Sequence, residues 1–189
     1  DTAGLPPPQR DVDGLVSVLV DATQLDRPLT EARMLGWHAA LFPTGHSGMQ
    51  RIDVGRWRTG PMSVRSGPLG SERVHFEGPP PDRVDVEIAA FLAWWSEARP
   101  SLDGVLRAGI AHLWFETIHP FDDGNGRVGR AIADLALAQA DGVPGRWSSL
   151  SRAILEERKG YYRELAAAQS GDLDVTAWLL WFVGCVTRA

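Results

Sequence analysis

Apolar side chains recur at helical spacing along most of the chain. The clearest run has five of them within three turns: Val84, Ile88, Phe91, Leu92 and Trp95. That spacing places all five on one face of an α-helix. Comparable runs predict further helices over about 11–24, 30–42, 103–118, 128–140, 148–169 and from 174 onward. Thr30 and Asp103 are residue types that cap helix starts, so the pattern predicts an all-α protein with two marked helix N-termini.

One stretch ahead of the middle of the chain breaks this pattern. Met62 and Val64 alternate with polar residues, and so do Val74 and Phe76. Between the two runs lies Gly-Pro-Leu-Gly at 67–70, a sequence typical of tight turns. The alternation favours a β-hairpin, and an irregular surface loop is the other interpretation that these residues allow.

Length, composition and charge bound the class of protein. The chain has 189 residues, 44% hydrophobic and 23% charged, which is typical of one globular domain. A net charge of −5 argues against nucleic acid or an anionic membrane as partner, and no apolar run is long enough to span a membrane. The single cysteine, Cys185, excludes an internal disulfide and favours a cytoplasmic location. It lies in an apolar run, so we expect a buried, inert thiol.

The first residues differ from the rest of the chain. They include Pro6, Pro7 and Pro8, and consecutive prolines favour an extended, semi-rigid conformation. We interpret residues 1–10 as a linker from an upstream region and residues 11–189 as a single domain.

A polar loop at 119–130, His-Pro-Phe-Asp-Asp-Gly-Asn-Gly-Arg-Val-Gly-Arg, joins two predicted helices. Pro120 lacks an amide proton and disfavours the α conformation in the residue before it, so the first helix should end at His119. The backbone N–H groups around Gly124 and Gly126 can form an anion-binding nest, and they lie at the start of the second helix. The loop therefore predicts a phosphate site.

Four side chains add chemistry to this loop. Arg127 and Arg130 are three residues apart on the emerging helix, so they share a face and can both contact phosphate oxygens. Asp123 is a hard oxygen donor of the kind that holds Mg²⁺ together with substrate phosphates. His119 ordinarily titrates near neutral pH and can accept a proton from a hydroxyl. Together they indicate an enzyme that transfers a phosphate-containing group.

Three simpler interpretations compete with this one. Residues 124–129 match the pattern G-x-G-x-x-G, but a dinucleotide site needs a preceding strand, and a helix is predicted there. A calcium-binding EF-hand that starts at Asp123 would need Asp or Asn at its fifth position and Gly at its sixth, where Arg127 and Val128 stand. A helix-loop-helix corner without chemistry remains, and the aligned chemical roles argue against it.

The loop resembles the signature of the Fic family, H-P-F-x-D-G-N-G-R-x-x-R, at every specified position. Members typically transfer AMP from ATP to a protein hydroxyl with Mg²⁺. The resemblance implies a bundle of six to eight helices with a small hairpin. It implies His119 as the general base, Asp123 as the metal ligand and Phe121 as a buried plug. The phosphate cradle would be formed by Gly124, Asn125, Gly126, Arg127 and Arg130.

The resemblance also assigns two flanking regions. A flap at about 56–78 would cover the nucleotide through Val64, Arg65 and Ser66, and it would pair with the target protein along its edge. A later helix would contact adenine through Tyr161, Tyr162 and Gln169. Gln169 stands where other members have Asn, and the two tyrosines can also be interpreted as ordinary half-buried packing residues.

The prediction is a cytoplasmic protein adenylyltransferase that modifies Tyr, Thr or Ser of a target protein with ATP and Mg²⁺. A homodimer is a further possibility. One alternative keeps the fold but uses another nucleotide or phosphate donor. The other is a catalytically silent module that binds a nucleotide and regulates a partner.

Overall fold

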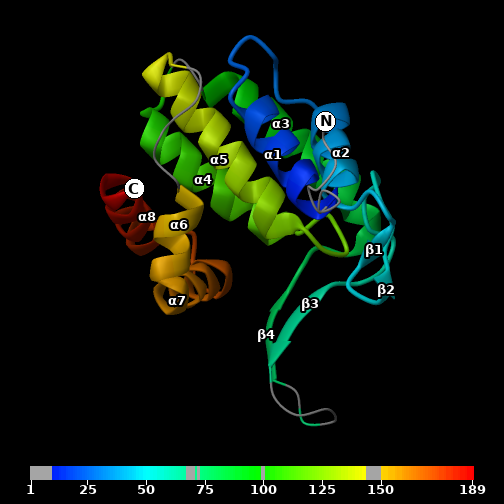
Figure 1. Ribbon diagram of the computed structural model, residues 1–189. Coiled ribbons are helices and arrows are strands. Elements are labelled where there is room, and N and C mark those ends of the chain that lie inside the picture. The colour runs from blue at the N-terminus through cyan, green and yellow to red at the C-terminus, as the bar shows by residue number, and fades with distance from the viewer. Residues whose placement is uncertain (1–9, 67–70, 72, 99–100, 144–149) are drawn as a thin grey trace, which may run out of the picture.

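The computed structural model describes residues 10–66, 71, 73–98, 101–143 and 150–189. Within them it has eight α-helices and two small antiparallel hairpins (Figure 1). The helices are α1 (Arg10–Ala22), α2 (Glu31–Leu41), α3 (Val84–Ala98), α4 (Gly104–Ile118), α5 (Asn125–Asp141), α6 (Leu150–Glu156), α7 (Arg158–Ser170) and α8 (Thr176–Arg188). The strands are β1 (His46–Ser47), β2 (Gln50–Arg51), β3 (Ser63–Ser66) and β4 (Arg73–Glu77). The predicted all-α class is confirmed.

The centre of the molecule is the antiparallel pair α4 and α5, joined by the loop 119–124. In the middle of α5, residues 131–138 are buried except for the half-buried Asp134, and alanines there alternate with larger apolar residues such as Ile132 and Leu135. Gly104 at the start of α4 meets Ala140 at the end of α5, and a Cβ on Gly104 would lie 2.1 Å from the Cβ of Ala140. Small residues therefore let the two helices approach closely, which fixes the loop between them.

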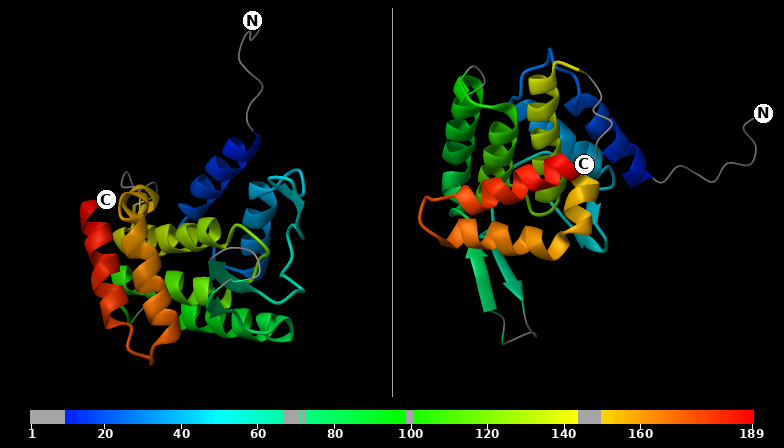
Figure 2. Two further views of the ribbon diagram at one scale, coloured as in Figure 1. Left: turned by 90° about the horizontal axis from the view of Figure 1, so that it is seen from below. Right: turned by 90° about the vertical axis from the view of Figure 1, so that its left-hand side faces the viewer.

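The other helices pack around this pair. The helices α1 and α2 contact one side of α5, α3 lies beside α4, and α7 and α8 pack on α4 from a different side (Figure 2). Both predicted helix starts are present: the Thr30 side chain accepts from the Arg33 amide, and Asp103 Oδ1 accepts from the amides of Val105 and Leu106. None of the described helices is both long and apolar enough to cross a membrane.

The hairpin interpretation of the flap is correct. Strands β3 and β4 pair antiparallel, with Val64 opposite Phe76 and an irregularity between Val64 and Arg65. The hairpin projects away from the helices (Figure 1), while its base stays close to α7. The predicted turn at 67–70 and most of the predicted linker, 1–9, lie outside the described residues. The short hairpin of β1 and β2 was not predicted from the sequence.

Candidate active site

The first helix of the site ends where the sequence predicted, and its last residue is strained. His119 follows α4 in the left-handed conformation, with φ 49° and ψ 59°. Among the described residues it is the one non-glycine with positive φ. Such a conformation costs on the order of 1–3 kcal/mol and persists only when its surroundings enforce it.

Arg58, ahead of the flap, enforces this turn. Its buried guanidinium donates through Nε to the His119 carbonyl at 2.8 Å, and its other nitrogens donate to the carbonyls of Gly60 and Pro79 at 2.9 and 2.6 Å. Its own backbone N–H donates to the Pro120 carbonyl at 2.8 Å. One side chain thus joins the end of α4 to both ends of the flap. Sequence reasoning missed it, because its acceptors are backbone carbonyls of separate segments.

A second residue that the sequence did not reveal, His38 on α2, holds the loop from the other side. Its ring stacks on the fully buried ring of Phe121, with centroids 4.0 Å apart. Its Nδ1 accepts from the Gly55 amide at 3.1 Å, so Nε2 carries the proton and donates to the Asp123 carbonyl at 3.1 Å. Burial lowers the pKa of His38, which keeps the ring neutral for these two bonds. The prediction that Phe121 is a buried plug is confirmed.

Asn125 closes the loop through its side chain. Its Oδ1 accepts from the Phe121 amide at 2.9 Å and its Nδ2 donates to the Phe121 carbonyl at 2.8 Å. The side chain is buried and fully used within the loop, so what Asn125 can offer a ligand is its backbone N–H. The first N–H groups of a helix lack partners within the helix, and α5 begins here after Gly124, whose φ is 86°. The geometry is that of an anion site.

Cationic side chains flank these N–H groups. Arg127 lies over the ring of Phe42 at 4.4 Å, and its Nη2 is 3.8 Å from Asp123 Oδ2. Arg130 is close to the loop, since a Cβ built on Gly126 would lie 3.1 Å from Arg130 Nη1. The two arginines predicted for phosphate binding are therefore both beside the anion site.

The two adjacent aspartates differ in their surroundings. Asp122 Oδ2 accepts from the Asp53 amide at 3.1 Å, which ties it to the segment before the flap. Asp123 keeps 48% of its side chain exposed, accepting from the Gly124 amide through Oδ1 and from the Ser47 hydroxyl through Oδ2. A half-exposed carboxylate at the edge of a phosphate site fits Mg²⁺, which takes one or two carboxylates plus phosphate oxygens and waters.

The His119 ring has one nitrogen committed and one available. Nδ1 is 3.2 Å from the Glu116 carbonyl, which can only accept, so Nδ1 carries the proton and Nε2 has the lone pair. Burial lowers the pKa of His119, and the hydrogen bond to Glu116 opposes this effect. The ring is therefore a neutral imidazole near pH 7, the form that a general base requires.

The His119 ring borders a cavity of about 660 Å³, a size typical of small-ligand sites. Residues from the flap, from the end of α4 and from α7 line the cavity. Its lining residues are Val64, Phe76, Glu116, His119, Arg158, Tyr162, Arg163, Leu165, Ala166 and Gln169. Val64, predicted to cover the nucleotide, and Tyr162 and Gln169, predicted to contact adenine, line the same cavity as His119. Glu116, Arg158 and Arg163 were not predicted, because nothing local distinguishes them from surface charges.

The structure does not bring Tyr161 to the cavity. Tyr161 faces the core with 5% of its surface exposed, and its hydroxyl is 3.0 Å from Nε2 of the buried His112. Neighbouring residues on a helix point in different directions, so only one tyrosine of the pair can face the ligand. Arg65 and Ser66 belong to β3 by their backbone, but their side chains lie outside what the structure describes.

Comparisons with known proteins agree with this geometry. The family model described as the Fic/DOC family matches residues 28–137. A probable protein adenylyltransferase from Aquifex aeolicus (strain VF5) is 32% identical over 97 residues, 51% of this chain and 28% of that protein. A uridine 5′-monophosphate transferase from Xanthomonas campestris pv. campestris (strain 8004) is 30% identical over 123 residues, 62% of this chain and 22% of that protein.

A solved structure shows the same fold. The crystal structure of a Fic family protein from Desulfovibrio desulfuricans G20 matches with a TM-score of 0.74 and 27% identity, over 98% of this chain and 53% of that one. The chain spans less than a third of the length of either curated relative. Since the family model covers more than half of the chain and contains the whole loop 119–130, the protein belongs to the Fic/DOC family.

Proposed function

We propose that this domain is a protein adenylyltransferase, which transfers AMP from ATP to a hydroxyl side chain of a target protein. The observation that carries the proposal is the position of His119. Its proton-free Nε2 belongs to a ring that borders a nucleotide-sized cavity, and the anion site at the start of α5 follows it by five residues. A general base, a cavity for the nucleobase and a phosphate site are thus adjacent, as nucleotidyl transfer requires.

The roles of the loop residues follow from their contacts. The N–H groups at the start of α5 would bind phosphate oxygens, with Arg127 and Arg130 beside them to balance the negative charge. Asp123 would hold Mg²⁺, which when bound neutralises the phosphates and helps pyrophosphate to leave. His119 Nε2 would remove the proton from the target hydroxyl. The hydroxyl oxygen then attacks the α-phosphorus and the bond to pyrophosphate breaks.

The base of the nucleotide would lie between the flap and α7. Val64 and Phe76 supply apolar surface from the flap, and Tyr162 supplies an aromatic side chain that is 53% exposed. Gln169 Nε2 donates to the Glu116 carbonyl at 3.2 Å, which leaves its amide oxygen as an acceptor. An acceptor suits the amino group of adenine, and this is the observation that favours ATP.

The second candidate is UMP transfer from UTP with the same base and phosphate contacts. The observation that supports it is the similarity to the Xanthomonas transferase over 62% of this chain. In either case we propose that the target docks on the flap, because a two-stranded hairpin leaves unpaired strand edges to which an extended segment can bind.

Nucleotides labelled at single phosphates test the proposal. The domain is incubated with Mg²⁺ and a cell lysate as the source of target proteins, in parallel with ATP labelled at the α-phosphate, ATP labelled at the γ-phosphate and UTP labelled at the α-phosphate. We expect protein-bound label from α-labelled ATP alone, and intact mass of the labelled protein should show one added AMP. Label from the γ-phosphate would indicate phosphate transfer, and ATP binding without any label would indicate a regulatory module.

A further inference from the structure

The catalytic end of α4 contains a buried acid with no assigned role. Glu116 lies one helical turn before His119 and is 5% exposed. Its Oε1 has no hydrogen-bond partner among the described residues. A buried carboxylate oxygen without a partner is unfavourable, and such groups concentrate where a reaction uses them. Glu116 also borders the cavity that His119 borders.

Glu116 stands between the base and the second arginine of the loop. On one side, its Oε2 is 3.9 Å and its carbonyl oxygen 3.2 Å from His119 Nδ1. On the other side, its Oε1 faces the start of α5: a Cβ on Gly129 would lie 2.9 Å from it, and one on Gly126 would lie 3.7 Å from it and 3.1 Å from Arg130 Nη1. The glycines leave the space that this carboxylate occupies.

Proton transfer to His119 places a positive charge in a region that already holds several. The Arg58 guanidinium binds the His119 carbonyl, and Arg130 and Arg127 lie on the adjacent helix turn. The cation formed in the reaction therefore needs a nearby anion. Glu116 is the acid whose side chain faces the ring at Nδ1, the nitrogen that keeps its proton while Nε2 takes up the second one.

We propose that Glu116 is a positioning residue for the transfer reaction: its carboxylate holds the Nδ1–H edge of His119, presents Nε2 to the target hydroxyl and stabilises the imidazolium formed. Only the expected effect of Glu116 on kcat rests on the proposed function. The arrangement of Glu116, His119 and Arg130 is a property of the folded domain, and it can be measured without any substrate.

The ionisation of Glu116 gives this arrangement a dependence on pH. Burial raises the pKa of Glu116 to about 7, and Arg130 opposes the rise. The other groups that face it are His119 after the end of α4, His112 on α4 and the Tyr161 hydroxyl on α7. Because the carboxylate forms only as pH rises through about 7, its support of His119 should strengthen over the same range.

The decisive variant is Glu116→Gln, which keeps the shape and removes the charge. The matched control is Glu97→Gln, an exposed acid on the neighbouring helix α3. The first measurement is the titration of His119 by NMR in the free domain. Glu116 and His119 titrate as a coupled pair, and a carboxylate 3.9 Å from Nδ1 favours the protonated ring. Glu116→Gln should therefore lower the apparent pKa of His119, whereas Glu97→Gln should leave it unchanged.

The second measurement separates transfer from binding. We expect Glu116→Gln to lower kcat by about 10²–10³-fold, the order of effect of an ion pair at this separation near a protein surface. ATP affinity should stay the same or tighten, because an anion beside Arg130 is removed. Glu116→Asp, which keeps the charge, should recover part of kcat and part of the titration shift.

Two results would overturn the proposal. One is a His119 titration in Glu116→Gln that equals the wild type, with kcat as in Glu97→Gln. The other is weakened ATP affinity with an unchanged His119 titration, which would indicate a packing role. If the wild-type domain transfers no label at all, the proposed function fails, and the NMR titration still decides the placement of Glu116.

Discussion

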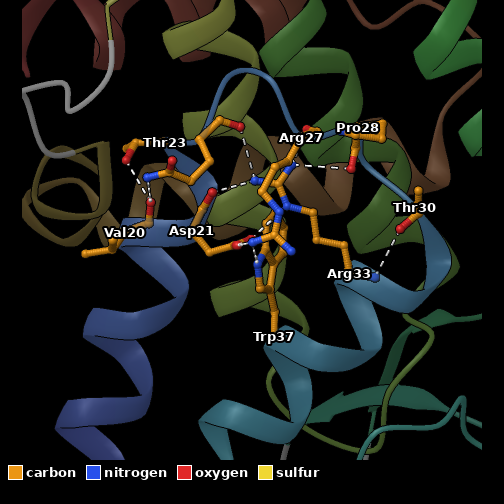
Figure 3. A network of polar contacts seen from close by, with 9 residues as sticks. Val20, Asp21, Thr23, Arg27, Pro28, Thr30, Arg33 and Trp37 are labelled. Atoms are coloured by element: carbon orange, nitrogen blue, oxygen red, sulfur yellow. Dashed lines mark hydrogen bonds and ion pairs between the residues drawn. The ribbon is translucent and has the colours of Figure 1, made fainter.

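Two buried charged clusters lie in different parts of this domain, and their bonding differs. At the junction of α1 and α2, the guanidinium of Arg33 is 8% exposed and surrounded by acceptors (Figure 3). Its Nε donates to Asp21 Oδ2 at 2.7 Å, its Nη atoms donate to backbone carbonyls, and Trp37 Nε1 donates to the same Asp21 oxygen at 2.7 Å. At the end of α4 beside the loop, Glu116 Oε1 is buried and has no hydrogen-bond partner within the described part of the chain.

The difference separates a structural cluster from a reactive one. A buried charge that serves the fold alone is stabilised by a full set of partners, and Arg33 has them. At the end of α4, the left-handed His119 and the Glu116 oxygen that lacks a partner among the described residues both reduce stability, and burial keeps His112 neutral by lowering its pKa to about 4. Such groups are retained where a substrate or a transferred proton completes their bonding.

The largest expected effect is that of His119→Ala. Loss of the base should slow AMP transfer by about 10²–10⁴-fold. ATP affinity should change little, because the proposed phosphate contacts come from the α5 N–H groups and the arginines and not from His119. Label transfer and calorimetry with ATP and Mg²⁺ measure the two quantities. Loss of ATP binding together with activity would contradict the role assigned to His119.

The adjacent aspartates allow a matched test within the loop. Asp123→Ala should abolish Mg²⁺-dependent transfer, because its half-exposed carboxylate is the proposed metal ligand. Asp122→Ala should have a mild effect, because the Asp122 carboxylate accepts a hydrogen bond from the Asp53 amide and is not the proposed metal ligand. A titration of activity with Mg²⁺ compares the two variants. Equal losses in both would refute Asp123 as the metal ligand.

At the structural cluster, Asp21→Asn should destabilise the fold without a specific effect on catalysis. The Arg33 guanidinium would lose its carboxylate in the interior, which costs about 3 kcal/mol of the free energy of unfolding. Urea unfolding measures this loss. Arg27→Ala is the control, because Arg27 is 60% exposed in the same network and should contribute at most about 1 kcal/mol. If the folded Asp21→Asn variant has a lowered kcat, the cluster around Arg33 is not purely structural.

Glu116→Gln should change the free energy of unfolding in the opposite direction, by stabilising the fold. The folded-state pKa of Glu116 is raised from 4.5 to about 7, so the wild type loses stability as pH rises between these values. The variant lacks this loss and should be more stable at pH 8 by about 3 kcal/mol, with no difference below pH 4.5. Thermal unfolding across this pH range measures the difference. A less stable variant at pH 8 would mean that Glu116 is a structural ion-pair partner like Asp21.

The sequence by itself predicted most of the helices and the loop of the site, and it favoured the flap hairpin. The single helix predicted over 148–169 is two helices in the structure, α6 and α7. These features depend on short-range chemistry: the 3.6-residue periodicity, the block that Pro120 places on α4, and the glycines at the start of α5. The positions of His119, Asp123 and the two arginines follow from them, because all lie within one twelve-residue stretch.

Only the tertiary structure decided what holds that stretch in place and how its groups are charged. Arg58 and His38 reach the loop from segments about 60 and 85 residues away in the sequence, through backbone atoms that have no sequence signature. Packing turned Tyr161 into the core and Tyr162 to the cavity, although both are adjacent on α7. The state of Glu116 depends on burial and on Arg130 from another helix, and neither is present until the chain has folded.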